Sequence, residues 1–242
     1  KTPGRTLLWS PYGFTGDWGN GENATRTYEN LKKLALAYAT RGSSLEGNTT
    51  LRDDIISGLD FMNTKYYSGF VAPTSMNWWH MQIGATIPLN DITVIMYDDL
   101  TPTQIANYMA AIDWFNPSVD KTGANRAWDA VIIGVRGVIG KDSAKIANAT
   151  AGISNFLDYV TKLDGYYEDG SFVQHNYYAY TGGYGISLLE SISNLMFLLA
   201  GSSFDITDPD IVNVYQWVYD SYEPLIYKGA MMDMVRGREI SR

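Results

Sequence analysis

The chain has 242 residues, of which 45% are hydrophobic and 18% are charged, and its formal net charge is −8. This composition predicts a globular protein with a substantial core and excludes an intrinsically disordered chain. The acidic balance argues against nucleic acid as a partner, and no apolar run is long enough to cross a membrane. The chain has no cysteine, which excludes disulfides and thiol chemistry within it.

Apolar residues recur at helical spacing along most of the chain. After an arm rich in glycine, threonine and asparagine, the first two predicted helices present apolar faces, the second with Thr50 as its N-cap. A further helix begins at Thr101, because Pro102 suits the first helical position. The apolar faces of the first two helices are Leu31, Leu34, Ala35 and Tyr38, and then Leu51, Ile55, Leu59 and Met62. The remaining predicted helices are 83–100, 101–115, 126–138, 143–160, 184–199 and 209–226.

No stretch shows a convincing run of alternating strand residues, so we predict an all-α fold. Helices of ordinary length joined by medium loops suggest helix pairs stacked as an α/α toroid or solenoid. We treat residues 1–242 as a single domain of this kind.

Asn125 directly precedes the apolar pattern of the helix predicted at 126–138 and follows Gly123. Two interpretations stay open for it. Asparagine at this position commonly caps a helix, and without other evidence capping is the more frequent role. An amide beside the free N–H groups of a helix start can also bind a carboxylate.

His175 and Tyr184 lie nine residues apart, on either side of Gly182 and Gly183. On one helix they would point in opposite directions, but the two glycines make a continuous helix improbable and allow the backbone to approach another group closely. A loop at His175 that leads into a helix at Tyr184 would bring both to one place. For an isolated pair, ordinary packing is the simpler interpretation.

Two other groups suit a carbohydrate site. Trp78 and Trp79 follow Asn77, and adjacent tryptophans cannot both face the core of a helix, so we expect one ring to be exposed where it can stack on a sugar. The segment 228–242 is locally positive on an acidic chain and ends in a cluster of arginines. An amide, a tyrosine and arginines are suited to holding a carboxylate while a proton leaves the neighbouring carbon.

These residues lie in four stretches through which the chain resembles the family 8 polysaccharide lyases, which act on hyaluronan, chondroitin and xanthan. The stretches are NWWHMQIG at 77–84, TGANRAW at 122–128, DGYYEDGSFVQHNYYAYTGGYG at 164–185 and YKGAMMDMVRGREISR at 227–242. The resemblance covers nearly the whole chain. The stretches GANRAW, NWWH and YKGAMMDMVR, together with the sequence around Asp208, are most similar to bacterial xanthan lyases.

The resemblance implies an α/α toroid followed by antiparallel β-sandwich domains. Residues 1–242 match only the N-terminal part of the toroid, so the resemblance predicts a piece of a longer enzyme whose β-sandwich domains are absent from this chain. The remaining C-terminal part of the same enzyme is then an expected partner. We also expect Met231, Met232 and Met234 to be exposed in the isolated piece.

The resemblance also implies roles for single residues. It makes Asn125, His175 and Tyr184 the catalytic amide, imidazole and phenol, and Arg238 the arginine that supports the phenol and lowers its pKa. It makes Arg242 a substrate-binding arginine. The aromatic patch, with substrate-binding residues Asn77, Trp78 and Trp79, completes the expected site.

The implied activity is β-elimination at O4 of a glucuronate, and the implied partner is an acidic polysaccharide. The resemblance favours a secreted bacterial enzyme that releases the terminal, pyruvylated mannose of xanthan side chains. The alternatives are a hyaluronate or chondroitin lyase of the same family and a non-catalytic carbohydrate-binding helical module. The resemblance implies no metal or organic cofactor at the site, and a structural calcium elsewhere in the longer enzyme is compatible with it.

Overall fold

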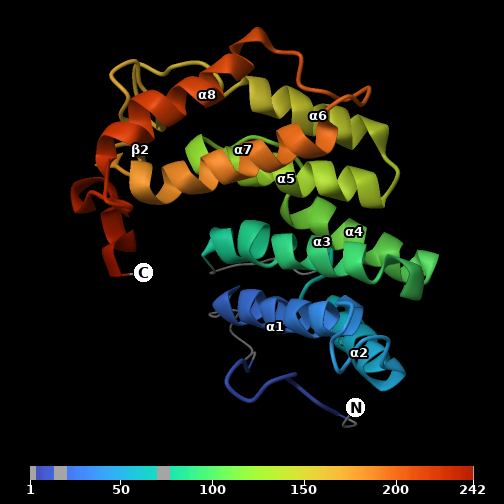
Figure 1. Cartoon of the computed structure of the whole chain (residues 1–242). Helices are drawn as coiled ribbons and strands as arrows, with labels where there is room; N and C mark the ends of the chain where they lie inside the picture. Colours follow the sequence, from blue (N-terminus) through green and yellow to red (C-terminus); the bar gives the residue numbers. More distant parts are fainter. Residues whose placement is uncertain (1–3, 14–20, 70–76, 242) are drawn as a thin grey trace. The chain divides into compact units, whose positions relative to one another are not determined.

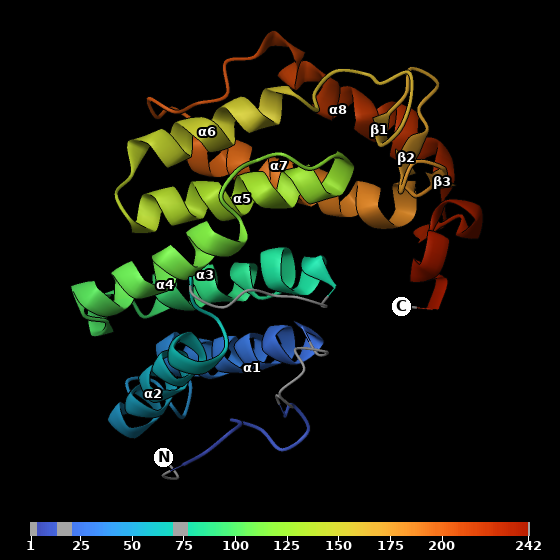
Figure 2. The same ribbon diagram turned by 180° about the vertical axis from the view of Figure 1, so that it is seen from behind.

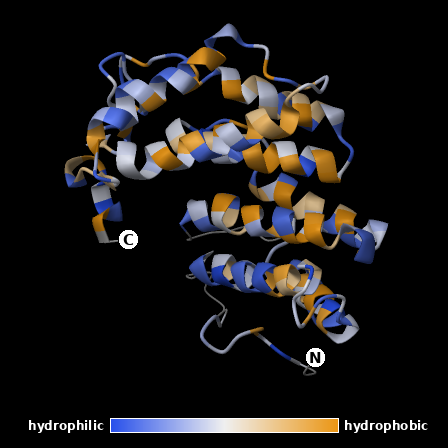
Figure 3. Cartoon of the chain, in the orientation of Figure 1, coloured by the Kyte–Doolittle hydropathy of each residue, from blue (hydrophilic) through white to orange (hydrophobic). Residues whose placement is uncertain are grey.

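A computed structural model describes residues 4–13, 21–69 and 77–241 of the chain (Figure 1). The chain forms two compact units. The first comprises residues 1–117 and 135–142, and the second comprises residues 118–134 and 143–242. Helices dominate both units among the described residues, which confirms the predicted all-α class. Hydrophobic and hydrophilic residues alternate along these helices (Figure 3), as expected for amphipathic helices.

Among its described residues, the first unit contains four complete α-helices that pack on one another. Helix α1 contacts α2 and α3, and α4 contacts the same two helices. The helices are α1 (Gly21–Ala39), α2 (Thr49–Lys65), α3 (Thr86–Ile95) and α4 (Pro102–Phe115). A π-helical turn, His80–Gly84, precedes α3, and a 3-10 turn, Tyr97–Asp99, follows it. The predicted helix 83–100 is therefore helical throughout its middle but changes its winding at both ends.

The helix starts show how local chemistry fixes the elements. Thr101 forms the expected N-cap of α4, and its hydroxyl and the Gln104 side chain make a reciprocal capping box. The expected cap of α2 is wrong. Asn48 is the N-cap, its Oδ1 accepting from the Leu51 N–H at 2.9 Å, and Thr50 lies inside the helix. Asparagine is at least as good a cap as threonine, and it stands where the chain is still extended.

The second unit contains α6 (Ser143–Ser154), α7 (Ile186–Leu199) and α8 (Asn213–Trp217), together with most of α5 (Gly123–Ile139). Helices α5, α6 and α7 lie side by side in both views (Figures 1 and 2). Their buried side chains share one core cluster, in which Trp217 stacks on Tyr166 with ring centroids 4.0 Å apart. Among the described residues, this core holds the segments that carry most of the predicted site.

Short strands are the main feature that the sequence did not predict. A three-stranded antiparallel sheet has the order β1 (Gly165–Tyr166), β2 (Phe172–Gln174) and β3 (Tyr178–Ala179), and a second pair joins β4 (Ile226–Tyr227) to β5 (Ala230–Met231). Strands of two or three residues are too short to show a period-2 pattern. The sheet nevertheless determines where the loop that carries His175 turns.

Two predicted helices are corrected. The helix expected at 143–160 ends at Ser154. Beyond it the chain pairs with β1, where the Val160 N–H donates to the Tyr166 carbonyl. The continuous helix expected at 209–226 is instead a succession of four windings. These are a 3-10 turn (Pro209–Val212), α8, a π-helical turn (Val218–Tyr222) and a 3-10 turn (Glu223–Leu225).

The apolar surface expected near the C-terminal arginines is present in part. Met232 and Met234 are exposed, whereas Met231 is half-buried and packs against the core of the second unit. Among the described residues, no helix combines the length and apolar character that crossing a lipid bilayer requires.

The corrected cap of α2 gives a first prediction. Replacing Asn48 by alanine should lower the free energy of unfolding by about 1 kcal/mol, because it removes the only side-chain cap described for this helix start. Urea unfolding followed by circular dichroism measures the change. Thr50→Ala is the matched control, and it should leave the midpoint nearly unchanged. A loss at Thr50 with none at Asn48 would contradict the assignment.

Candidate active site

Tyr184 lies at the centre of a cluster of aromatic rings in the second unit. It belongs to a π-helical turn, Thr181–Gly185, that leads into α7, and its side chain is 9% exposed. The Tyr180 and His175 rings meet it edge-on, with centroids 4.9 and 5.0 Å away, and the Trp128 ring lies 5.7 Å away. The loop-then-helix arrangement expected for His175 and Tyr184 therefore brings them together.

Arg238 holds the phenol oxygen of Tyr184. Its Nη2 donates a hydrogen bond to the Tyr184 Oη at 2.8 Å, and its backbone N–H donates to the Tyr180 Oη at 3.0 Å. The guanidinium also lies 5.9 Å from the centre of the Tyr184 ring. The contact expected between Arg238 and the phenol is thus present, and both tyrosines of the cluster bind the same residue.

Gly182 allows this approach of the C-terminal segment. A Cβ at Gly182 would lie 2.6 Å from the Met231 Cγ and 2.7 Å from the Arg236 Cγ, distances that real Cβ atoms do not show. The close backbone approach predicted from the two adjacent glycines therefore occurs, and the group approached is the arginine-bearing segment of the same chain.

The pKa of Tyr184 is set by two opposing effects. Burial raises it above the ordinary value for tyrosine, and the positive charge and hydrogen bond of Arg238 lower it. Burial is the larger effect, so the net direction is upward. The expected effect of Arg238 on the pKa of Tyr184 therefore has the right sign. The net pKa is nevertheless raised, because that expectation left out the desolvation of the phenol.

His175 lies in the loop between β2 and β3 and is exposed. It and Asn176 both have positive φ, at 55° and 69°, a region that residues other than glycine seldom occupy. Such conformations persist only where the surroundings impose them, and they concentrate at functional sites. The backbone here turns so that the imidazole meets the edge of the Tyr184 cluster.

Asn125 is the third residue of α5 and is 8% exposed. Its Oδ1 accepts no hydrogen bond from the described residues, so the interpretation of Asn125 as an ordinary N-cap is wrong. Trp128 lies one turn further along the same face of α5 and packs against Tyr184. Asn125 is therefore a buried amide, with an Oδ1 that has no donor among the described residues, on the face of α5 that adjoins the aromatic cluster.

Asp164 and Gln174 join the segment that carries Asn125 to the loop that carries His175. The Asp164 carboxylate accepts from the Thr122 hydroxyl at 2.8 Å, the Gln174 Nε2 at 2.7 Å and the Asn176 N–H at 2.7 Å. The Gln174 Oε1 accepts from the Ala124 N–H at 3.0 Å. Sequence reasoning missed both residues, and the only signal was their place inside the stretch 164–185 that carries the resemblance.

The aromatic patch belongs to the first unit. Trp78 is 45% exposed and Trp79 is half-buried, which confirms that only one of the adjacent rings is freely presented. Asn77 is exposed, and its Oδ1 accepts from the Trp79 N–H at 3.1 Å. Arg242, the expected substrate-binding arginine, lies outside the described residues.

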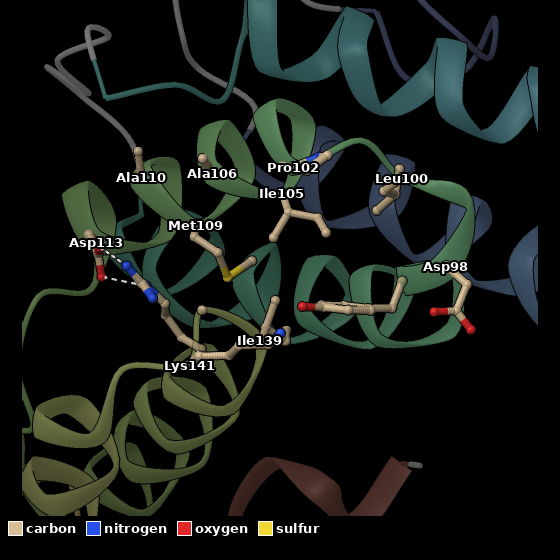
Figure 4. Close-up of a pocket in the computed structure, with 13 residues that line it drawn as sticks. Asp98, Leu100, Pro102, Ile105, Ala106, Met109, Ala110, Asp113, Ile139 and Lys141 are labelled. Carbon is tan, nitrogen blue, oxygen red and sulfur yellow. Dashed lines mark hydrogen bonds and ion pairs between the residues drawn. The ribbon is translucent and has the colours of Figure 1, made fainter.

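A pocket of about 650 Å³ in the first unit does not contain the predicted site (Figure 4). Apolar side chains such as Ile105, Met109 and Ile139 line it, and a bidentate ion pair between Arg136 and Asp113 borders it. None of the predicted site residues lines this pocket. Among the described residues, no group of three histidine, aspartate or glutamate side chains is arranged to hold a metal ion.

Comparison with known proteins identifies the family. The profile described as "Polysaccharide lyase family 8, N terminal alpha-helical domain" matches residues 1–242. The chain belongs to polysaccharide lyase family 8.

Named relatives agree with this assignment. Xanthan lyase of Bacillus sp. (strain GL1) is 51% identical over 98% of this chain and 26% of its own length. Hyaluronate lyase of Thermasporomyces composti is 41% identical over 99% of this chain and 31% of its own length. The chain thus spans between a quarter and a third of these relatives.

Solved structures show the same fold. A Paenibacillus xanthan lyase matches all of this chain and 23% of its own chain, with 55% identity and a TM-score of 0.93. The chondroitin AC lyase of Streptomyces coelicolor A3, solved with chondroitin sulphate, matches all of this chain and 33% of its own, with 39% identity and a TM-score of 0.93. The predicted fold, which is that of the N-terminal α-helical domain of family 8 lyases, is therefore confirmed.

The opposing effects at Tyr184 can be measured without any assay of activity. With tyrosine labelled by ¹³C at Cζ, NMR titration should place the pKa of Tyr184 above 10, because burial outweighs Arg238. Replacing Arg238 by methionine should raise this pKa further, because the charge that favours the phenolate is lost. Tyr184→Phe assigns the resonance. A pKa that falls in the Arg238→Met variant would contradict the contact.

Proposed function

We propose that this chain carries the elimination machinery of a polysaccharide lyase that cleaves at O4 of a glucuronate. The observation that carries the proposal is the 2.8 Å hydrogen bond from Arg238 to the buried Tyr184 Oη, beside the His175 ring. Trp128, from the helix that carries Asn125, packs against the same tyrosine. A phenol supported by a guanidinium can exchange a proton with a substrate. A buried amide and an imidazole nearby can neutralise a carboxylate.

The reaction needs two kinds of help. Removal of H5 leaves negative charge that spreads onto the uronate carboxyl, and hydrogen-bond donors at that carboxyl stabilise the charge. Asn125 supplies the amide donor, assisted by His175. The place of Asn125 on the face of α5 that carries Trp128, whose ring packs against Tyr184, supports this role.

Tyr184 then carries the proton. In glucuronate H5 and O4 lie on the same side, so one group can take H5 as the phenolate and return it to O4. The C5–H and C4–O4 bonds break, a C4=C5 double bond forms, and the leaving sugar receives the proton. Arg238 stabilises the phenolate, and burial, which raises the pKa of the phenol, makes that phenolate a stronger base toward H5. His175 is the alternative base, and its exposed position beside Tyr184 keeps that alternative testable.

Xanthan is the substrate that we propose. Support comes from the 51% identity to a xanthan lyase and from the 0.93 TM-score with another, whereas the hyaluronate and chondroitin lyases compared are 41% and 39% identical. The product would be the terminal, pyruvylated mannose of the side chain. Asn77, Trp78 and Arg242 would contact the sugars around the cleaved bond, with Trp79 buttressing the patch.

The remaining features of the enzyme are part of the same proposal. We propose that residues 1–242 act together with a further C-terminal part of the same enzyme, since the chain covers only 26% and 23% of the two xanthan lyases compared. We propose that the enzyme is secreted by a bacterium, as suits a polymer too large to enter a cell. The elimination requires no metal or organic cofactor, and any calcium would be structural.

A substrate panel tests the proposal directly. The complete polypeptide encoded by the gene should convert xanthan to products that absorb in the near ultraviolet, because elimination creates a double bond conjugated to the carboxyl. Release of mannose without that absorbance would mean hydrolysis and would overturn the lyase mechanism. Activity on hyaluronan or chondroitin with none on xanthan would retain the mechanism and overturn the substrate. Binding of the polysaccharide without turnover would favour a carbohydrate-binding module.

Asn125 provides a sharper test of the carboxylate site. Asn125→Ala should reduce kcat/KM by about 2 to 4 kcal/mol of transition-state stabilisation, by analogy with the loss of one oxyanion donor. The melting temperature should change little, because the Asn125 Oδ1 accepts no hydrogen bond within the described chain. A large drop in stability with unchanged activity of the folded fraction would instead restore a structural role for this amide.

A further inference from the structure

The two segments that carry Asn125 and His175 are joined by a closed set of hydrogen bonds. Gln174 is fully buried, and both ends of its amide are used: Oε1 accepts from the Ala124 N–H, and Nε2 donates to Asp164. Asp164 also accepts from the Asn176 N–H. His175 therefore stands between Gln174 and Asn176, which both donate hydrogen bonds to Asp164. Asn125 directly follows Ala124, whose N–H donates to Gln174.

Gln174 satisfies a helix start from a distant part of the chain. The Ala124 N–H belongs to the first turn of α5, where N–H groups have no acceptor within the helix. Gly123 makes room for the incoming amide, because a Cβ there would lie 2.4 Å from the Gln174 Oε1, and its φ is +52°. The start of α5 is thus built to accept Gln174.

Asp164 opposes the strain in the loop. The positive φ angles of His175 and Asn176 are strained, and they persist only where the surroundings impose them. The hydrogen bond from the Asn176 N–H to the Asp164 Oδ1, at 2.7 Å, fixes the second of these residues. Without it, the loop would relax, and the imidazole would move relative to the Tyr184 ring.

We propose that Asp164 and Gln174 are positioning residues that hold the Asn125 amide and the His175 imidazole at a fixed separation. This inference rests on the proposed lyase function, in which both groups meet one uronate carboxyl. Neither Asp164 nor Gln174 needs to touch substrate. Their effect arises because a donor displaced by about 1 Å can lower the rate by about a hundredfold.

The test is a reciprocal exchange in the complete enzyme. Asp164→Asn replaces one acceptor oxygen by an NH2 donor, so at least one of the two donors at this side chain, the Gln174 Nε2 or the Asn176 N–H, would face another donor. Gln174→Glu places two carboxylates against each other. The double variant, Asp164→Asn with Gln174→Glu, restores complementarity. The new amide at 164 can accept from the Asn176 N–H and donate to the new carboxylate at 174, which can accept from the Ala124 N–H.

Each single change should lower kcat roughly tenfold or more, with a smaller effect on KM. The double variant should return kcat to within roughly threefold of the unmodified enzyme, the coupling expected of two groups in direct contact. Asp60→Asn is the matched control in the first unit. The Asp60 carboxylate likewise accepts from the Gln104 Nε2 and from the Tyr108 hydroxyl. Its replacement by asparagine should leave kcat unchanged.

Hydrogen exchange separates the positioning role from the proposed function. Peptides covering 122–126 and 173–178 should exchange faster in each single variant and recover in the double variant, whatever the substrate. An enzyme that forms no unsaturated uronate would overturn the proposed function. The exchange data would still show whether the hydrogen bonds of Asp164 and Gln174 hold the two segments in place. Single variants with unchanged kcat and exchange, or a double variant no better than the singles, would overturn the positioning role.

Discussion

The hydrogen bond from Arg238 to the Tyr184 phenol is the interaction on which the site depends. It joins a π-helical turn before α7 to a segment more than fifty residues later in the chain. Through it, the guanidinium of Arg238 places a positive charge at the phenol oxygen. A hydrogen bond to a charged group contributes about 1.5–3 kcal/mol. This interaction favours the phenolate, whereas burial disfavours it, and burial is the larger of the two effects on the pKa of Tyr184.

Burial and charge at Tyr184 together give a group that can both take and return a proton. A fully solvated phenol would have neither effect. The backbone determines where His175 and Asn125 lie. His175 belongs to a strained turn between two short strands, and Asn125 belongs to the first turn of α5. Asp164 and Gln174 link these two pieces of backbone.

Much of this molecule was predictable from its sequence, and the exceptions have physical causes. Helical periodicity identified most of the helices, although it overran the ends of those expected at 143–160 and 209–226, and Thr101 with Pro102 located one start, because these signals are local. The sheet around His175 was missed because its strands are too short to show a pattern. The raised pKa of Tyr184 was missed because desolvation depends on which residues surround the ring in three dimensions. Asp164 and Gln174 are common residue types whose importance appears only once 122–124 and 174–176 lie together.

The most direct test is the crystal structure of the complete enzyme carrying Tyr184→Phe, with a xanthan side-chain oligosaccharide bound. This variant should bind substrate and leave it uncleaved. The account predicts the glucuronate carboxyl within hydrogen-bonding distance of the Asn125 amide, the His175 imidazole beside it, and C5 and O4 both facing the position of the missing hydroxyl. A glucuronate bound away from Asn125, or with C5 facing His175 and turned from position 184, would contradict it.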